Sequence, residues 1–265
     1  MRISYPYLPL LAFAIAFASA HKASATVVFE DDFTSYTAWS TGARPADAVW
    51  TVFGATAAAI VDGSTDSKFP DTYLRCSNRG VYVTLPKALT DDWDLTVTMA
   101  LSAYKQLSWF GLTDETGKNG YYVAWDTSEE GQYNGQGFLR IGELGDTTPS
   151  ATGNPGAYLT TAVKSGAIPV TANAGFNQFA SVTLSWVAAI HTLECRVNGS
   201  LISSVSDSSV ASFSRIYLEG GNQGYYGSVR LTTSAVPELA SVAGIFAAIV
   251  LGICVFRKSM GRKHA

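Results

Sequence analysis

The sequence predicts an all-β antiparallel sandwich, and three observations carry this prediction. Polar and apolar residues alternate with a period near two in runs such as Asp94–Leu101 and Ala180–Trp186, as half-buried strands require. Turn-forming sequences stand between such runs, among them Lys118-Asn119-Gly120 and Val197-Asn198-Gly199. The region between the two ends is poor in charge and rich in Gly, Thr, Ser and aromatic residues, which favours short strands joined by tight turns.

The expected strands follow one another along residues 26–235, a length typical of a single all-β domain. The alternation indicates which side chains of two strands face the core: Leu95, Val97, Met99 and Leu101 in one, and Val182, Leu184 and Trp186 in the other. Further strands are expected at Thr26–Phe29, Gly80–Leu85, Leu107–Thr113, Tyr121–Asp126, Phe138–Glu143, His191–Val197, Phe213–Glu219 and Tyr225–Thr233.

Residues 1–25 predict a secretory leader, an amino-terminal helix that is removed on export. Arg2 supplies positive charge near the amino terminus, and Leu8–Phe17 forms the apolar segment. Two A-x-A sites follow, at Ala18–Ala20 and Ala23–Ala25, and cleavage is expected after Ala25, where strand-like sequence begins. The alternative, an uncleaved anchor, needs an apolar run of about 20 residues, and the run here is shorter.

Residues 236–265 predict a tail that holds the carboxyl end at a membrane. Leu239–Phe256 contains 18 residues without a charge, which is long enough for one transmembrane helix. A basic end, residues 257–265, follows this run and is expected to stay in the cytoplasm, with the body outside, because lysine and arginine favour the cytoplasmic side. The basic residues of this end are Arg257, Lys258, Arg262 and Lys263.

This tail resembles the PEP-CTERM sorting signal of bacteria that make exopolysaccharide. The resemblance rests on Val236-Pro237-Glu238, the apolar run and the basic end. It implies that an exosortase-type peptidase recognises the tail and that the protein is processed on its way to the cell surface or extracellular matrix. The usual motif is Val-Pro-Glu-Pro, whereas position 239 is Leu. Two outcomes therefore stay open: processing of the tail, or retention of the helix as an anchor.

Charge separates the body from its ends and argues against a nucleic-acid partner. All 21 acidic residues and 12 of the 18 basic residues lie between Glu30 and Glu238, so this segment carries a net charge of −9. A face that binds nucleic acid needs a basic patch to displace counterions from phosphates. The sequence therefore predicts no nucleic-acid partner, and a membrane contact only through the tail.

The order of segments in the body resembles the concanavalin A-like, laminin-G-like jelly roll. The resemblance rests on an opening Phe29–Phe33, a middle part that runs from Trp109-Phe110-Gly111-Leu112 to Tyr121–Trp125, a Leu193–Gly199 hairpin and a closing Gly227–Leu231 strand. It implies that the last strand lies near the first. It also implies a non-catalytic surface or matrix protein that binds carbohydrate or another surface component.

Glycoside hydrolases share this fold, and they need two carboxylates about 5–5.5 Å apart for retention of configuration. The corresponding strand pattern is Glu-x-Asp-x-x-Glu. The nearest sequence here contains Asp126 and Glu129, but position 124 is Ala where the first Glu would stand. We therefore expect no catalytic residues. The alternatives are a glycan-active hydrolase or lyase with a different site, and a purely structural matrix component.

The sequence predicts no cofactor, with calcium as the one candidate metal. Asp91, Asp92 and Asp94 form a small acidic cluster that could supply oxygen ligands, and the alternative is a solvated turn rich in aspartate. His191 lies alone in the body and is expected to be a structural residue on a strand. A single body histidine gives little basis for a zinc site.

Cys76 and Cys195 are the two cysteines of the body. An exported protein can join such a pair in a disulfide, and two separate buried thiols are the alternative.

For ligand binding, aromatic residues beside Gly-rich and Asn-rich turns could stack on sugar rings, although most aromatic residues in a sandwich belong to its core. The candidates are Trp125, Tyr133, Tyr225 and Tyr226.

Overall fold

The computed structural model describes residues 25–36, 49–53, 58–61, 72–76, 79–101, 107–126, 138–144, 156–161, 163–164, 179–220 and 224–233. Val27–Thr233 form one compact unit. The predicted leader up to Ser24, and the whole predicted tail with its apolar run 239–256, lie outside the described residues. Within the described part, no helix has the length and hydropathy that crossing a membrane requires.

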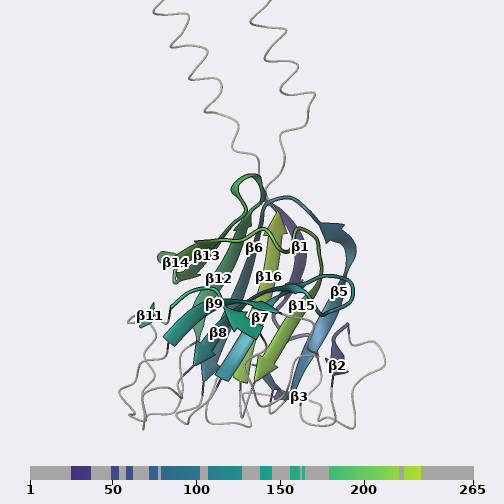
Figure 1. The fold of residues 1–265 in the computed structure, drawn as a ribbon. Coiled ribbons are helices and arrows are strands. Elements are labelled where there is room, and N and C mark those ends of the chain that lie inside the picture. Colours follow the sequence, from purple (N-terminus) through teal and green to yellow (C-terminus); the bar gives the residue numbers. More distant parts are fainter. Residues whose placement is uncertain are drawn as a thin grey trace, which may run out of the picture. The chain divides into compact units, whose positions relative to one another are not determined.

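Two antiparallel sheets make up this unit (Figure 1). The first, called sheet A, has the order β14-β13-β12-β6-β16-β4-β3, and β1 also pairs with β16. Its strands are β1 (Thr26–Asp31), β3 (Ala58–Val61), β4 (Tyr73–Cys76), β6 (Trp93–Leu101), β12 (Ala180–Val187), β13 (Thr192–Val197), β14 (Ser200–Ser206) and β16 (Gly224–Thr233). The first strand thus lies beside the last, as the jelly-roll resemblance implied.

The second sheet, called sheet B, has the order β10-β9-β8-β7-β15-β5-β2, and β11 also pairs with β9. Its strands are β2 (Thr51–Phe53), β5 (Arg79–Leu89), β7 (Leu107–Thr113), β8 (Gly120–Asp126), β9 (Phe138–Leu144), β10 (Gly156–Tyr158), β11 (Val163–Lys164) and β15 (Phe213–Gly220). The predicted antiparallel sandwich is confirmed.

One hydrophobic core fills the space between the sheets. The alternation of β6 and β12 turns their apolar residues inward as predicted: Leu95, Val97, Met99, Val182 and Leu184 are fully buried, and Trp186 is 1% exposed. The indole of Trp186 stacks on Tyr121 of sheet B, with ring centroids 5.6 Å apart. The core therefore joins the two sheets through large aromatic contacts.

Local turn chemistry explains two of the connections. Asn198 and Gly199 both have positive φ angles, 47° and 82°, and form the two-residue hairpin turn between β13 and β14 that the Asn-Gly pair predicts. Between β7 and β8, Asp114 accepts hydrogen bonds from the backbone N–H groups of Thr116 and Gly117. The side-chain amide of Asn119 also donates to Asp114, which fixes this longer turn.

Asp207 connects the segment after β14 to the core. Its Oδ1 accepts hydrogen bonds from the Tyr121 hydroxyl (2.6 Å) and from the backbone N–H of Ser209 (2.8 Å). Burial works to raise the pKa of this carboxyl, but the hydrogen bonds from Ser209 and Tyr121 outweigh it, so the pKa lies below its usual value.

We expect Asp207 to contribute to the acid sensitivity of the domain. Because its pKa is lower in the folded state, its stabilising contribution is complete above the ordinary aspartate pKa of about 3.9 and is lost as the pH falls through the folded value. The free energy of unfolding in urea, measured between pH 7 and pH 2.5, should fall less steeply in Asp207→Asn than in the wild type. Asp91→Asn, at an exposed position, is the control. Parallel curves for Asp207→Asn and the wild type would contradict the expectation.

Candidate functional site

The outer face of sheet B carries aromatic residues where solvent-facing polar residues are the norm. In β7 and β8, Phe110 and Tyr121 turn into the core, so Trp109 and Tyr122 beside them turn outward. Strand register aligns six outward positions in one line across β5, β15, β7, β8, β9 and β10. These positions are Tyr82, Tyr217, Gly111, Tyr122, Gly142 and Tyr158.

Four rings on this line, and that of Trp109 one outward position to its side, contact one another in sequence. Tyr82 stacks on Tyr217 with centroids 5.3 Å apart, and Tyr217 stacks on Trp109 at 6.3 Å. The Trp109 ring is tilted against Tyr122 at 5.7 Å, and Tyr122 against Tyr158 at 6.3 Å. We call these five residues the aromatic row. They bring together parts of the chain from residue 82 to residue 217.

Glycine makes room for the row. The ring of Tyr122 lies over Gly142, where an added Cβ atom would come within 2.1 Å of the tyrosine Cζ atom. A side chain at this position and the flat Tyr122 ring therefore exclude each other. Gly142, which stands between Tyr122 and Tyr158 in the line, is what allows the Tyr122 ring to lie across the sheet.

Gly142→Val is expected to displace the Tyr122 ring and to lower the free energy of unfolding by about 1–3 kcal/mol, the usual cost of overpacking. The measurement is urea unfolding of Gly142→Val, Tyr122→Ala and the double variant. If the clash with the ring is the cause, Tyr122→Ala should remove most of the valine's cost, as a double-mutant cycle would show. Additive effects of the two substitutions would contradict this explanation.

The row is buried at its centre and open at its ends. Trp109 is 1% exposed, Tyr122 is fully buried and Tyr217 is 5% exposed. Burial raises the pKa of the Tyr122 and Tyr217 hydroxyls, so both stay protonated and can donate hydrogen bonds near neutral pH. Tyr82 and Tyr158, at the two ends, are half-buried and still reach the solvent.

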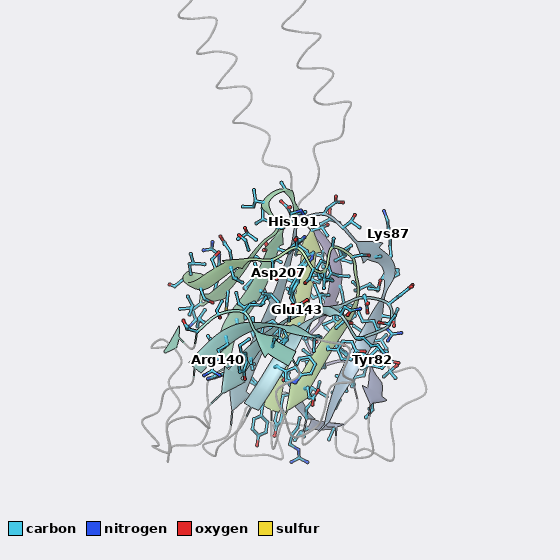
Figure 2. The ribbon with its side chains drawn as sticks, in the orientation of Figure 1. Tyr82, Lys87, Arg140, Glu143, His191 and Asp207 are labelled. Carbon is cyan, nitrogen blue, oxygen red and sulfur yellow. The ribbon has the colours of Figure 1, made fainter. Side chains whose placement is uncertain are left out.

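Two arginines lie on the same face, one at each end of the row. The Arg140 guanidinium lies over the Tyr158 ring, 4.4 Å from its centroid, and that of Arg215 lies over Tyr82 at 5.2 Å. Figure 2 shows Arg140 and Tyr82 on opposite sides of this face. Glu219 is 2% exposed and pairs with Trp109 in the register of β15 and β7. The face thus combines aromatic rings, two cations and one buried carboxylate.

The aromatic residues proposed from the sequence lie elsewhere. Trp125 and Tyr226 belong to the main core, 2% and 0% exposed, and Tyr225 is fully buried against Tyr73 with ring centroids 5.6 Å apart. These three side chains are buried, so none of them offers a ring face to a sugar. Tyr133 lies outside the described residues.

The hydrolase pattern is incomplete where the structure describes it. Ala124 is buried on the outer face of sheet B between Trp109 and Arg140, its partners in register, so no carboxylate occupies the position of the first Glu. Asp126 is the last residue of β8 and pairs with Leu107 and Phe138. Glu129 and Glu130 lie outside the described residues.

The aspartates proposed for calcium do not gather in a site. Asp92 accepts a hydrogen bond from the backbone N–H of Ala188 (2.8 Å), and Asp94 is an exposed residue of β6 that pairs with Ser185 and Thr232. Within the described ranges, no three His, Cys, Asp or Glu side chains are placed to hold a metal ion. Calcium binding through Asp91, Asp92 and Asp94 stays a prediction from the sequence.

Of the two alternatives left open for Cys76 and Cys195, the structure shows two separate buried thiols and no disulfide. Cys76 lies on β4 and Cys195 on β13, four strand steps apart in sheet A. That separation is about 19 Å at about 4.8 Å a step, whereas a disulfide needs Cα atoms within about 7 Å. Burial raises the pKa of both thiols, that of Cys195 to about 12, and nearby Glu219 adds to the effect at Cys76.

Both thiols are expected to resist iodoacetamide in the folded protein and to react fully in urea, because buried, protonated thiols are poor nucleophiles. Mass spectrometry of the body, residues 26–235, counts the modified cysteines. Ser200→Cys, at an exposed position of β14, should react at once under native conditions and serves as the control. Alkylation of Cys76 or Cys195 at the rate of this control would contradict the expectation.

His191 lies one residue before the strand that was expected to contain it. It follows the 3-10 helix Ala188–Ile190 with a φ of 48°, and β13 begins at Thr192. Its exposed ring contacts Trp186, with centroids 5.6 Å apart. The strand prediction is wrong at this residue because the chain makes a tight turn there.

Comparison with known proteins indicates the fold. No family model matches the chain, and no curated protein matches it. Among solved structures, β-agarase A from Zobellia galactanivorans is similar with a TM-score of 0.53 at 13% identity, over 82% of this chain and 95% of that chain. β-Agarase A in complex with oligoagarose has a TM-score of 0.50 at 11% identity, over 79% and 93%.

The carbohydrate-binding module CBM66 from Bacillus subtilis matches with a TM-score of 0.42 at 12% identity, over 68% of this chain and 93% of that chain. The likeness to the agarase structures, at this level of identity, shows the jelly-roll fold and nothing about function.

Proposed function

We propose that the body is a non-catalytic module that binds polysaccharide on the outer face of sheet B. The two ends of the aromatic row carry this proposal, because the half-buried rings of Tyr82 and Tyr158 offer flat apolar surface on which sugar rings can stack. Arg140 and Arg215 lie over these two rings and add polar groups to the same part of the face. The solved structures that share the fold include a β-agarase seen with oligoagarose, which is consistent with a glycan ligand.

The shape of the row favours a chain over a single sugar. The row crosses six neighbouring strands of sheet B, with β5 at one end and β10 at the other. Five steps of about 4.8 Å between neighbouring strands make it about 24 Å long. Its half-buried ends, Tyr82 and Tyr158, are the parts open to a ligand. A polysaccharide can contact both ends at once, and two linked contacts bind more tightly than either alone.

The experiment is binding of the body, residues 26–235, to a panel of soluble polysaccharides by affinity electrophoresis, followed by calorimetry. Retardation by at least one polysaccharide, lost on boiling the protein, supports the proposal. No binding at millimolar sugar, together with self-association in analytical ultracentrifugation, would favour a purely structural matrix component.

A hydrolase is the second candidate, since the buried Glu219 carboxylate lies in register with Trp109 on this same face. Release of reducing sugar from the same panel would support it, provided that Glu219→Gln or Asp126→Asn abolishes the release. Binding without release supports the non-catalytic module.

We further propose that the chain is exported and sorted through its tail by an exosortase-type peptidase. The support comes from the sequence: the A-x-A site at Ala23–Ala25, Val236-Pro237-Glu238, the apolar run and the basic end. Mass spectrometry of the native protein from membrane, surface and secreted fractions tests this. A protein that begins at Thr26 and lacks the segment after Glu238 supports sorting, whereas one that retains Arg257 and Lys258 is a membrane-tethered ectodomain.

A further inference from the structure

We propose that the folded body limits where its own tail can be cut, because β16 holds the chain up to Thr233. This inference rests on the proposed sorting and specifies how that processing is regulated. The observation that carries it is the short stretch of chain between the fold and the sorting motif, Val236-Pro237-Glu238. Only two residues, Ser234 and Ala235, stand between the end of β16 and this motif. We call these two residues the spacer.

β16 is an interior strand of sheet A and is paired to its last residue. Its antiparallel ladder with β6 covers the whole strand, from Gly224 to Thr233, where Thr233 pairs with Trp93. On its other side β16 pairs with β4 and with β1. An edge strand can be bound by another chain through its unpaired main-chain groups, whereas an interior strand has both edges occupied. A peptidase therefore cannot use β16 as a substrate unless the strand first leaves the sheet.

The core and a bulge fix β16 along its length. Val229 and Leu231 are fully buried in the main core. Gly227 is the extra residue of a β-bulge, because the register with β6 shifts between Tyr226 and Ser228. A slip of the strand by two residues toward the tail would bring Gly227 into the core position of Val229. The strand therefore cannot lengthen the spacer by slipping without losing core burial.

A peptidase binds its substrate as an extended strand, with about four residues on the amino-terminal side of the bond that it cuts. For the bond between Pro237 and Glu238 these are residues 234–237, which all lie beyond β16. For a bond one or two residues earlier, Thr233 must leave its pairing with Trp93. Such fraying is a local opening of the fold, and it lowers the fraction of chains that can be cut. The spacer is thus just long enough for a cut within the sorting motif.

The test measures the processed fraction of the full-length protein, made in its own cells, by mass spectrometry of membrane, surface and secreted fractions. In the wild type we expect the mature chain to end at Pro237 or later. Deletion of the spacer should lower the processed fraction by about tenfold or more, because each cut then requires the end of β16 to open. Ser234→Gly with Ala235→Gly keeps the length of the spacer, and this matched control should be processed like the wild type.

A second variant separates the effect of the fold from recognition of the spacer by the peptidase. In the deletion chain, Thr232→Gly and Thr233→Gly weaken the end of β16, because glycine lowers the stability of a strand. These substitutions should restore part of the lost processing, and thermal unfolding checks that the body is folded. No restoration would show that the deletion acts on recognition alone and would overturn the inference.

Limited digestion gives a readout that needs no sorting peptidase. The purified full-length protein, in detergent, is treated with a broad-specificity endopeptidase, and the mass of the resistant fragment gives its carboxyl end. We expect this end no earlier than Val236, because residues up to Thr233 are held in sheet A.

The outcomes separate this inference from the proposed function. Equal processing of the deletion chain and the wild type, or a mature or resistant fragment that ends before Val236, would overturn the inference and leave the proposed sorting intact. Wild-type protein that keeps Arg257 and Lys258 in every fraction would overturn the proposed sorting, and this inference with it.

Discussion

Replacing Tyr82 and Tyr158 together by alanine is expected to weaken polysaccharide binding by more than about tenfold. The two rings are the solvent-reaching ends of the aromatic row, and each also supports an arginine, so both stacking and charge-assisted contacts are lost. A loss of 1.4 kcal/mol corresponds to about tenfold in affinity, which a single lost ring contact can supply. Calorimetry with the best polysaccharide of the panel measures the effect.

Controls for this variant come from apolar residues exposed away from sheet B. Ile190 is 64% exposed and Leu201 is 51% exposed, and Ile190→Ala with Leu201→Ala removes comparable apolar surface from the other sheet and its connection. These two substitutions should leave affinity unchanged. If the control weakens binding as much as the tyrosine pair does, the ligand lies elsewhere and the aromatic row is only a second core.

Trp186→Ala is expected to lower the free energy of unfolding by about 3–5 kcal/mol, the usual cost of removing a buried tryptophan. The indole contacts Tyr121 and Phe213, both from sheet B, and is 1% exposed. Its removal therefore leaves a cavity at the junction of the two sheets. A shift of the urea midpoint at unchanged m-value would report the loss.

Trp186→Phe separates volume from polarity at this position. The Nε1 atom of Trp186 is buried without a hydrogen-bond partner, so phenylalanine removes an uncompensated polar group while keeping an aromatic ring. Its cost should be less than half that of alanine. Equal costs for the two variants would contradict the cavity explanation, because phenylalanine fills most of the volume that alanine leaves empty.

The sequence was sufficient for the strands that are long enough to show alternation. All ten expected strands are present, and their core-facing residues, Val97 and Leu184 among them, are buried as predicted. Strands such as β10, with three residues, and β11, with two, were missed because so few residues show no period. β14 was missed because its serines are polar on both faces, SLISSVS.

The candidate site could not be predicted in the same way, because it depends on which strands are neighbours. Tyr82 and Tyr217 are far apart in sequence and stack because β5 and β15 pair. Strand order also excludes the disulfide between Cys76 and Cys195, which spacing along the chain could not decide. One local signal was available: adjacent aromatics in a strand, as in Trp109-Phe110 and Tyr121-Tyr122, place one ring on each face.

The order in which the chain is synthesised gives the sheet topology a further meaning. β16 lies between β6 and β4 in sheet A, and β15 lies between β7 and β5 in sheet B. The last two of the described strands to be made are therefore interior strands, one in each sheet. Neither sheet can close until residues 213–233 have emerged, and such non-local pairing makes folding slow. A carboxyl-terminal truncation before Phe213 would leave two incomplete half-sheets with open edges. We therefore expect the chain to stay unfolded through most of its synthesis, a state that the export proposed above would require before folding.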